Sequence, residues 1–508
     1  MRGLWAIAIA LLITTAALTA LSWPAAGVGS VFGSAAPGGD GPIGWVFPAT
    51  ALMMLAGFAW MALPPAIRAA DQAQGPPWRT LALILAVGFA MRLIFFASEP
   101  LWELDYHRYL WEGAAVNVGL NPYALSPAEA RLGPAAGTPH VEAWRALAAA
   151  HPTELSAVTY DKLRSVYPPL AQAAFAAAHA LEPFSLTALR AVFLLCELAA
   201  LGLLALLLKE VGRPPSWIAL YWWNPLVARE LVCAAHMEAV LLPFLLAALL
   251  FAARKRWLAG AAAVALAGAV KLWPLALGAL ALRGAGWARF FAGAAMIGAI
   301  TVLASLPILL GRLDAGSGFV AYAGEWERNA ALFPALAALT EGILEALGLP
   351  FVDAAPVARI GVLLTVSALA ALLALRPVAD AEDLCRRCLI VIAAMFLLSP
   401  AAYPWYAVWF APLLAVFPWA GLRLLMATLP LYTLRFWFVA EGDPTVFDTW
   451  IVWAQIGPVL LLLGWEAHRA AKGGRRGTGA AAQVHAAKGE AGYAARGATS
   501  STQARPGR

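Results

Sequence analysis

The chain has 508 residues, of which 62% are hydrophobic and only 13% are charged. A soluble domain carries about 25% charged residues, so this composition excludes an ordinary soluble protein. Apolar runs recur along the whole chain, whereas the strands of a membrane barrel alternate apolar and polar residues. The sequence therefore predicts an all-α fold, a polytopic bundle of transmembrane helices.

The net charge of +6 is concentrated at the C-terminal end. Residues 466–508 hold the excess of basic residues, and they are rich in Gly and Ala without helical periodicity. We expect residues 1–465 to form the membrane domain and residues 466–508 to form a disordered, basic tail on the cytoplasmic side. Because the charge lies in this tail, it does not indicate a nucleic-acid-binding surface.

The candidate spans, in chain order, are residues 4–21, 46–61, 81–97, 186–208, 218–227, 231–253, 258–270, 272–282, 290–310, 357–375, 389–398, 406–417, 422–438 and 450–463. Several are too short to cross a hydrocarbon core of about 30 Å alone, so half-helices or re-entrant segments are expected. The pattern predicts about 11 to 13 crossings. The first run, which follows Arg2, is expected to be a signal anchor.

Basic residues cluster in one set of loops, which the positive-inside rule places in the cytoplasm with the C-terminus. The other set is then external: residues 25–44, 98–169, 229–238, 313–333, 401–405 and 440–449. Most of the residues that are candidates for a functional site fall in this external set of loops. Within its longest member, residues 106–118 and 141–150 are expected to form helices, the first of them interfacial, and residues 170–181 a re-entrant run.

Glu103, Asp105, His107 and Arg108 follow a hydrophobic span directly, at a membrane–water boundary. A carboxylate there can take the proton of an attacking hydroxyl, which makes Asp105 a candidate base. His107 and Arg108 are candidate contacts for a leaving phosphate. Alternatively, Asp105 pairs with Arg108 and only stabilises a helix. Two acids can also bind a divalent metal, although hard ions usually need more oxygen ligands, so no cofactor is inferred and a metal is left open.

A second cluster consists of Asn224, Arg229, Glu230, His236 and Glu238. Ionisable residues between apolar runs are costly and usually face a cavity, so the cluster is expected to contact substrate. Arg229 and His236 are seven residues apart and are expected on one helix face. An Arg229–Glu230 pair that only reaches the lipid headgroups is the alternative.

Three further residues are candidates for substrate binding. Lys271 lies within an apolar run, and Arg435 lies near the external end of its span, so each is suited to a phosphate. Trp405 belongs to an aromatic group, residues 403–406, on which a sugar can stack. Each has an ordinary alternative, since Lys and Arg snorkel to headgroups and Trp anchors membrane interfaces.

The order and spacing of these motifs resemble GT-C glycosyltransferases, most nearly the bacterial polyprenyl-phosphate-mannose-dependent mannosyltransferases that are related to phosphatidylinositol-mannoside and GPI enzymes. The resemblance spans residues 81–465. The motifs that carry it are Glu103-x-Asp105-Tyr106-x-Arg108-Tyr109, Asn121-Pro122-Tyr123, Tyr167-Pro168-Pro169, Trp223-Asn224-Pro225, His236-Met237-Glu238, Lys271-x-Trp273-Pro274 and Pro404-Trp405-Tyr406.

The resemblance implies an inverting enzyme that moves a sugar, here mannose, from a polyprenyl-phosphate donor to a glycolipid or glycan acceptor. It implies Asp105 as the base with Glu103 assisting, Tyr167 as a substrate contact, and basic residues that hold the phosphate. The expected location is a bacterial inner membrane, with the site on the periplasmic face. Two other classes remain open: a lipid-linked-oligosaccharide polymerase or ligase, and a transporter or flippase of lipid-linked sugars.

Overall fold

The computed structural model describes residues 1–26, 42–73, 75–133 and 140–472. The described chain is a bundle of helices and contains no named β-strand, so the expected all-α fold class is confirmed. Residues 27–41, which belong to the expected external loop at 25–44, lie outside the described residues. The expected tail beyond Lys472 also lies outside them. The last helix runs from Phe447 to Lys472, so it extends past Glu466, where the tail was expected to begin.

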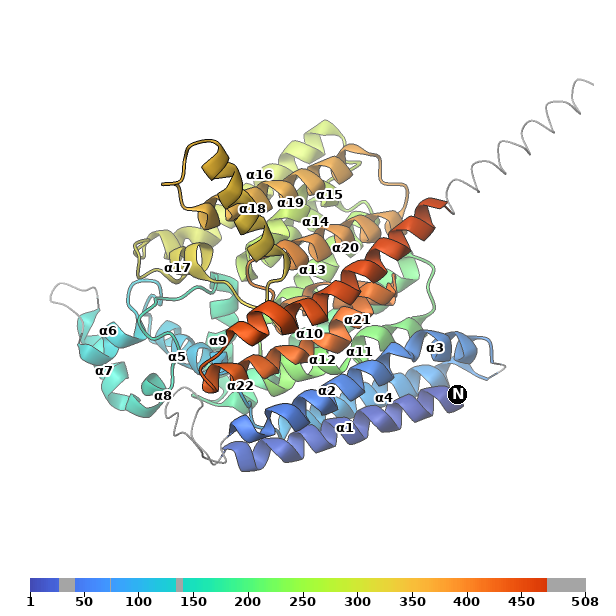
Figure 1. The fold of residues 1–508 in the computed structure, drawn as a ribbon, viewed down its shortest axis with the longest axis horizontal. Helices are drawn as coiled ribbons and strands as arrows, with labels where there is room; N and C mark the ends of the chain where they lie inside the picture. Colours follow the sequence, from blue (N-terminus) through green and yellow to red (C-terminus); the bar gives the residue numbers. More distant parts are fainter. Residues whose placement is uncertain (27–41, 74, 134–139, 473–508) are drawn as a thin grey trace, which may run out of the picture.

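The N-terminal helices form one side of the bundle (Figure 1). They are α1 (Arg2–Ala26), α2 (Val46–Met61) with its short continuation α3 (Leu63–Asp71), and α4 (Pro77–Phe96). Apolar side chains of α1 are both buried and exposed, as in Leu11 and Ile13, because one face packs on α2 and α4 while the other is free to meet lipid.

The rest of the bundle is built around α10 (Leu186–Glu210), α13 (Glu238–Ala253) and α14 (Trp257–Val270), which pack in sequence. The outer helices are α16 (Trp287–Leu309), α18 (Leu332–Ala346), α19 (Ala354–Leu375), α20 (Ala381–Leu398), α21 (Ala420–Thr428) and α22 (Leu434–Ala440). Helix α16 leaves most of its apolar side chains exposed, which is typical of a lipid-facing helix.

Eight helices in the described chain are long and apolar enough to cross a membrane, and two shorter apolar helices are Glu238–Ala253 and Trp257–Val270. This is fewer than the 11 to 13 crossings expected from sequence. The difference arises where apolar runs break into short turns, at residues 215–233, 273–281 and 404–415. Prolines begin these turns, at Pro215, Pro225, Pro404 and beside Trp273, because proline removes a backbone donor and interrupts a helix.

Where the structure describes them, the two sets of loops lie at opposite ends of the bundle (Figure 1). At one end Ser216 donates to Asp71, Arg254 pairs with Glu210, and Arg283 donates to the carbonyl of Arg376, so the basic loops contact one another. At the other end lie α5 (Asp105–Asn117), α6 (Pro127–Leu132), α7 (Val141–Ala150), α8 (Pro152–Ser156) and α17 (Gly318–Glu325) (Figure 1). The predicted helices at 106–118 and 141–150 are thus confirmed.

Helix α9 (Pro169–Leu181) packs directly against α5. The contact needs a glycine, because a Cβ on Gly113 would lie 2.5 Å from the carbonyl oxygen of Phe175. Tyr109 of α5 stacks on Phe175 with ring centroids 4.4 Å apart. These contacts fix α5, and the residues at its start, to the body of the bundle.

A buried ion pair joins α4 to α10. Arg92 donates from Nε to Glu197 at 3.1 Å, and both side chains are fully buried. The Arg92 guanidinium also lies 3.7 Å from the ring of Trp222, whose indole packs on Gly88. Arg92 lies in the last part of α4, four residues before Phe96, and the pair neutralises its charge inside the protein.

Candidate active site

Asp105 is the first residue of α5, which begins just after α4 ends and the chain turns at residues 97–104. A carboxylate in the first turn of a helix is favoured by the exposed N–H groups there. Asp105 is half-buried, and among the described residues its carboxylate has no hydrogen bond or ion pair. Burial raises the pKa of Asp105, and the nearby charges of His236 and Arg108 act in the opposite direction. This carboxylate is therefore available to accept a proton.

Glu103, in contrast, is fully engaged. Its two oxygens accept from Arg229 at 3.0 and 2.6 Å, and Arg229 also donates to Glu230 at 2.6 Å. All three side chains are buried. Glu103 therefore anchors the turn before Asp105 to the second cluster, and it is held too firmly to act as an alternative base.

The second cluster is built on an irregular turn. After the short helix α12 (Pro225–Ala228), the chain forms a π-helical turn, Arg229–Cys233, and then Ala235 takes a left-handed conformation with φ 53°. The expectation that Arg229 and His236 share a helix face is therefore wrong. The turn still brings the two residues together, because both reach Glu230: Nδ1 of His236 lies 3.0 Å from a Glu230 oxygen. That ring is not aligned for a hydrogen bond.

His236 stacks on Trp405, with ring centroids 4.1 Å apart and planes at 17°. Trp405 stacks in turn on Tyr403 at 4.3 Å. The aromatic group from residues 403–406 therefore lies beside the ionisable cluster, as expected if it lines a sugar site.

Lys271 lies at the break between α14 and the turn Trp273–Leu277, in extended conformation. Its Nζ donates to Glu238 at 2.7 Å and lies 3.7 Å from the ring of Tyr406. The lysine side chain keeps 21% of its surface exposed, whereas Glu238 is buried. Lys271 is thus a paired but accessible cation near Asp105.

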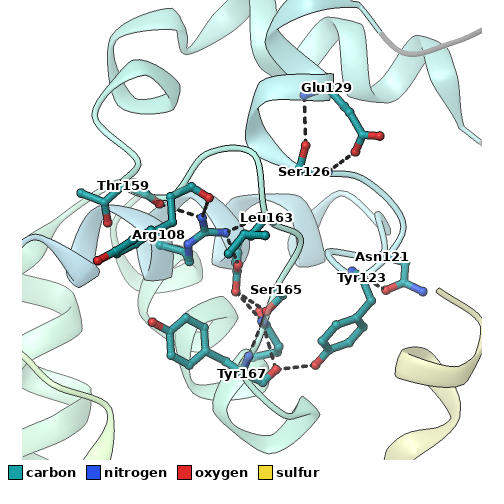
Figure 2. A network of polar contacts seen from close by, with 12 residues as sticks. Arg108, Asn121, Tyr123, Ser126, Glu129, Thr159, Leu163, Ser165 and Tyr167 are labelled. Atoms are coloured by element: carbon teal, nitrogen blue, oxygen red, sulfur yellow. Dashed lines mark hydrogen bonds and ion pairs between the residues drawn. The ribbon is translucent and has the colours of Figure 1, made fainter. Parts of the chain in front are cut away.

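Arg108 is not placed as a phosphate contact. Its guanidinium donates to the carbonyl oxygens of Thr159 at 2.7 Å, Tyr160 at 2.6 Å and Leu163 at 3.1 Å (Figure 2). It also contacts Glu112 at 3.3 Å, whereas no ion pair joins it to Asp105. Arg108 therefore ties the loop at 159–163 to α5, and neither of the roles considered for it from sequence matches this arrangement.

Glu112 extends this network one turn further along α5. It accepts from Ser165 at 2.8 Å and from Gln172, and Tyr123 donates through its hydroxyl to the Tyr167 carbonyl at 2.6 Å (Figure 2). Tyr167 lies edge-on to Tyr109, with ring centroids 5.0 Å apart. Its backbone is thus held in the network, while its ring faces the start of α5.

Three other residues that were expected to contact substrate instead contact other residues of the protein. Asn224 caps α12 by accepting from the backbone N–H groups of Leu226 and Val227. His107 lies against the ring of Tyr106, and burial lowers its pKa, so it is mostly uncharged at neutral pH. Arg435 pairs with Asp448, with its Nε 3.3 Å from the carboxylate.

Sequence reasoning missed the segment from Trp326 to Asn329. Its backbone pairs with residues 400–402, since Arg328 donates to the Pro400 carbonyl and accepts from Ala402, both at 2.9 Å. The Nε1 of Trp326 donates to the Tyr403 hydroxyl at 2.9 Å. Arg328 is half-buried beside Tyr403, and no carboxylate in the described chain lies within ion-pair distance. Only its position in an external loop could have suggested it.

Within the residues that the structure describes, no three His, Cys, Asp or Glu side chains are grouped to hold a metal ion. Three of the acidic residues, Glu103, Glu230 and Glu238, are instead paired with Arg229 and Lys271.

Comparison with known families identifies the chemistry. A family model described as alpha-(1→6)-mannopyranosyltransferase, N-terminal domain, matches residues 3–289, more than half of the chain. The chain belongs to this family. It is therefore a glycosyltransferase of mannose, which confirms the family expected from the motifs. Comparison with curated proteins and with solved structures finds no match.

The region matched by the mannosyltransferase family model contains Asp105, the Glu103–Arg229–Glu230 group, His236, Glu238 and Lys271. Trp326, Arg328 and the aromatic residues 403–406 lie beyond it. The site therefore combines residues from both halves of the chain.

Proposed function

We propose that this mannosyltransferase moves mannose from a polyprenyl-phosphate donor to a hydroxyl of a glycolipid or glycan acceptor, with inversion at the sugar and formation of an α-(1→6) bond. The bond type follows the description of its family. The site faces the external, periplasmic side of a bacterial inner membrane, and the C-terminus is cytoplasmic. The observation that carries the proposal is Asp105, a half-buried carboxylate without a partner among the described residues, beside the accessible cation Lys271.

In the proposed reaction the acceptor hydroxyl attacks the anomeric carbon of mannose. The new C–O bond forms as the bond to the phosphate oxygen breaks, and the proton of the hydroxyl passes to Asp105. The leaving polyprenyl phosphate keeps the bonding electron pair. Its charge is balanced by Lys271 and Arg328, since a guanidinium without an acidic partner suits a phosphate fork.

Glu103 and Arg229 have a positioning role in this proposal. Their two hydrogen bonds hold the turn before α5, and Arg108 and Glu112 hold the turns that follow. Asp105 is thereby kept on a rigid element, which a base needs in order to meet the hydroxyl.

The charge distribution supports the proposed orientation. Basic loops contact one another at the end of the bundle opposite to α5, and basic loops favour the cytoplasm. Cysteine labelling of intact cells tests this. A cysteine at Leu132, which is exposed on α6, is expected to react with a membrane-impermeant maleimide, whereas one at Lys255 is not. Equal reaction at both positions contradicts the orientation.

The transfer experiment uses membranes that carry wild-type protein, Asp105→Asn or Asp105→Glu, with radiolabelled polyprenyl-phosphate mannose as donor. Wild type is expected to incorporate label into lipid or glycan fractions, and Asp105→Asn to lose about 100- to 10,000-fold in rate. Equal incorporation by both proteins would remove Asp105 from the mechanism. Transport of the donor across the membrane without any incorporation would favour the flippase alternative, and transfer of whole oligosaccharides would favour a ligase.

A further inference from the structure

An exposed tyrosine at the candidate active site is held in an unfavourable backbone conformation. Tyr160 has a φ of 51°, which bulky side chains rarely adopt, and 52% of its surface is exposed. Its carbonyl accepts from Arg108 at 2.6 Å and from the Leu163 N–H at 2.9 Å. These two donors hold the backbone of Tyr160 in its strained conformation while the side chain stays exposed, and strain of this kind persists where the surroundings enforce it.

The Tyr160 ring lies over Trp326, with centroids 4.8 Å apart and planes at 54°. Trp326 is half-buried and is fixed through its Nε1, which donates to the Tyr403 hydroxyl. Tyr160 and Trp326 come from separate loops, so their contact forms only in the folded protein. The pair presents two rigid aromatic rings with part of their surface free, a composition suited to apolar sugar faces.

Two aromatic paths connect this pair to the ionisable cluster. One runs from Trp326 to Tyr403, Trp405 and His236. The other runs from Trp326 to Tyr322, whose hydroxyl lies 3.0 Å from that of Tyr406, and so to Lys271. The Tyr160–Trp326 pair is therefore the exposed end of a continuous series of aromatic contacts that begins beside the ionisable cluster, and Tyr403, Trp405 and Tyr406 within the series are buried.

We infer that Tyr160 and Trp326 form a second binding subsite, which takes a hexose of the acceptor one or more residues away from the hydroxyl that reacts. The ligand class is a saccharide chain of neutral hexoses, because the two rings offer uncharged aromatic faces, whereas Asp105 and Lys271 lie at the other end of the aromatic contacts. Arg108 acts as a positioning residue for this subsite, since it binds the Tyr160 carbonyl and lies one turn after Asp105 on α5. The inference rests on the proposed function for its reacting end, but saccharide binding can be tested separately.

The transfer experiment compares two synthetic acceptors, methyl mannoside and an α-(1→6)-linked mannotetraose. We expect wild type to use the longer acceptor with an acceptor KM about tenfold lower, and Tyr160→Gly to lose most of that difference. Glycine removes the ring and also relieves the positive φ, so loss of folding is not the expected result. Tyr160→Phe keeps the ring and is expected to keep the preference. Phe351→Ala, at an exposed aromatic residue in another loop, is the matched control.

A binding measurement separates the two proposals. Fluorescently labelled mannotetraose is titrated against purified full-length protein in detergent and followed by fluorescence polarisation. Tyr160-dependent binding without mannosyl transfer would leave the subsite standing and overturn the proposed function. An unchanged preference for the longer acceptor in Tyr160→Gly, or equal losses on both acceptors, would overturn the subsite.

Discussion

Glu103 and Arg229 lie 126 residues apart in the chain and are joined by two hydrogen bonds between one carboxylate and one guanidinium. The pair links the turn before α5 to the π-helical turn of the second cluster. It is buried, and Arg229 also holds Glu230. The candidate base therefore follows directly after a fixed point of the structure.

Removal of Arg229 is expected to destabilise the protein strongly. In Arg229→Met, Glu103 and Glu230 remain buried without their cation, and breaking a buried pair in this way costs about 3–5 kcal/mol. Thermal unfolding in detergent measures the effect. Arg254→Met is the matched control, because the Arg254–Glu210 pair keeps 32% and 29% of its side-chain surfaces exposed and such pairs contribute about 0–1 kcal/mol. Equal shifts in both variants would contradict this account.

The pH dependence of transfer is expected to follow Asp105. A base must be deprotonated to accept a proton, so activity falls as pH falls through its pKa. Because burial raises the pKa of Asp105, the acid limb of kcat/KM should lie above the ordinary range for an aspartate. The measurement is kcat/KM against pH for wild type and Asp105→Glu, which should differ in the position of this limb. An acid limb that persists unchanged in the residual activity of Asp105→Asn would assign it to another group.

Lys271 is expected to act on the donor phosphate. Lys271→Met should lower kcat on the order of 100-fold, since a charge contact to the leaving group is lost. It also leaves Glu238 unpaired, so the double variant Glu238→Gln/Lys271→Met separates the two effects. If the double variant recovers stability but not transfer, the phosphate role holds. Recovery of both would reduce Lys271 to a partner of Glu238.

Arg328 and Arg435 are expected to differ. Arg328→Ala should lower kcat/KM for the donor about 10- to 100-fold, because a charged hydrogen bond to phosphate is lost. Arg435→Ala should have little effect, since Arg435 pairs with Asp448 at the edge of the site. Donor titrations of the two variants, made at one acceptor concentration, check this. A larger loss in Arg435→Ala would reverse the assignment.

Two helical glycines provide a test of the packing. A Cβ on Gly88 would lie 2.1 Å from the Trp222 indole, whereas a Cβ on Gly202 would meet no atom within 4 Å. Trp222 cannot yield easily, because its Nε1 donates to Leu85 and Arg92 lies over its ring. Gly88→Ala should therefore lower the unfolding temperature, and Gly202→Ala should maintain or raise it. A stable, fully active Gly88→Ala protein would contradict the packing of α4 on Trp222.

Local patterns in the sequence predicted the elements that depend on local order. The helices at 106–118 and 141–150 follow from short-range periodicity, and the structure contains them as α5 and α7. The family, too, followed from motif order and spacing. The number of long helices did not, because prolines and π-helical or 3-10 turns divide apolar runs that look continuous by hydropathy.

The hydrogen-bond and ion-pair partners of the charged residues could not be predicted from local sequence patterns. Arg108 was expected at a phosphate, but its donors are taken by carbonyls more than fifty residues away in the chain. Lys271 appeared isolated, yet its acidic partner lies in another helix. Arg328 carried no motif, and its distinguishing feature is that no carboxylate of the described chain forms an ion pair with it, although Glu327 precedes it, which only the folded arrangement defines.

The buried Arg92–Glu197 pair has a consequence for how the chain enters the membrane. Helix α4 leaves the ribosome 105 residues ahead of its acidic partner, so Arg92 must first meet the bilayer alone. An arginine costs about 2.5–3.5 kcal/mol at the centre of a span and less towards its end, where Arg92 lies, and hydrophobic neighbours on α4 offset part of that cost. The rest of the cost is removed when α10, which carries Glu197, and the turn that carries Trp222 have been synthesised and pack against α4. Insertion of this enzyme thus includes a delayed step, in which Arg92 of an early helix pairs with Glu197 of a helix that is synthesised later.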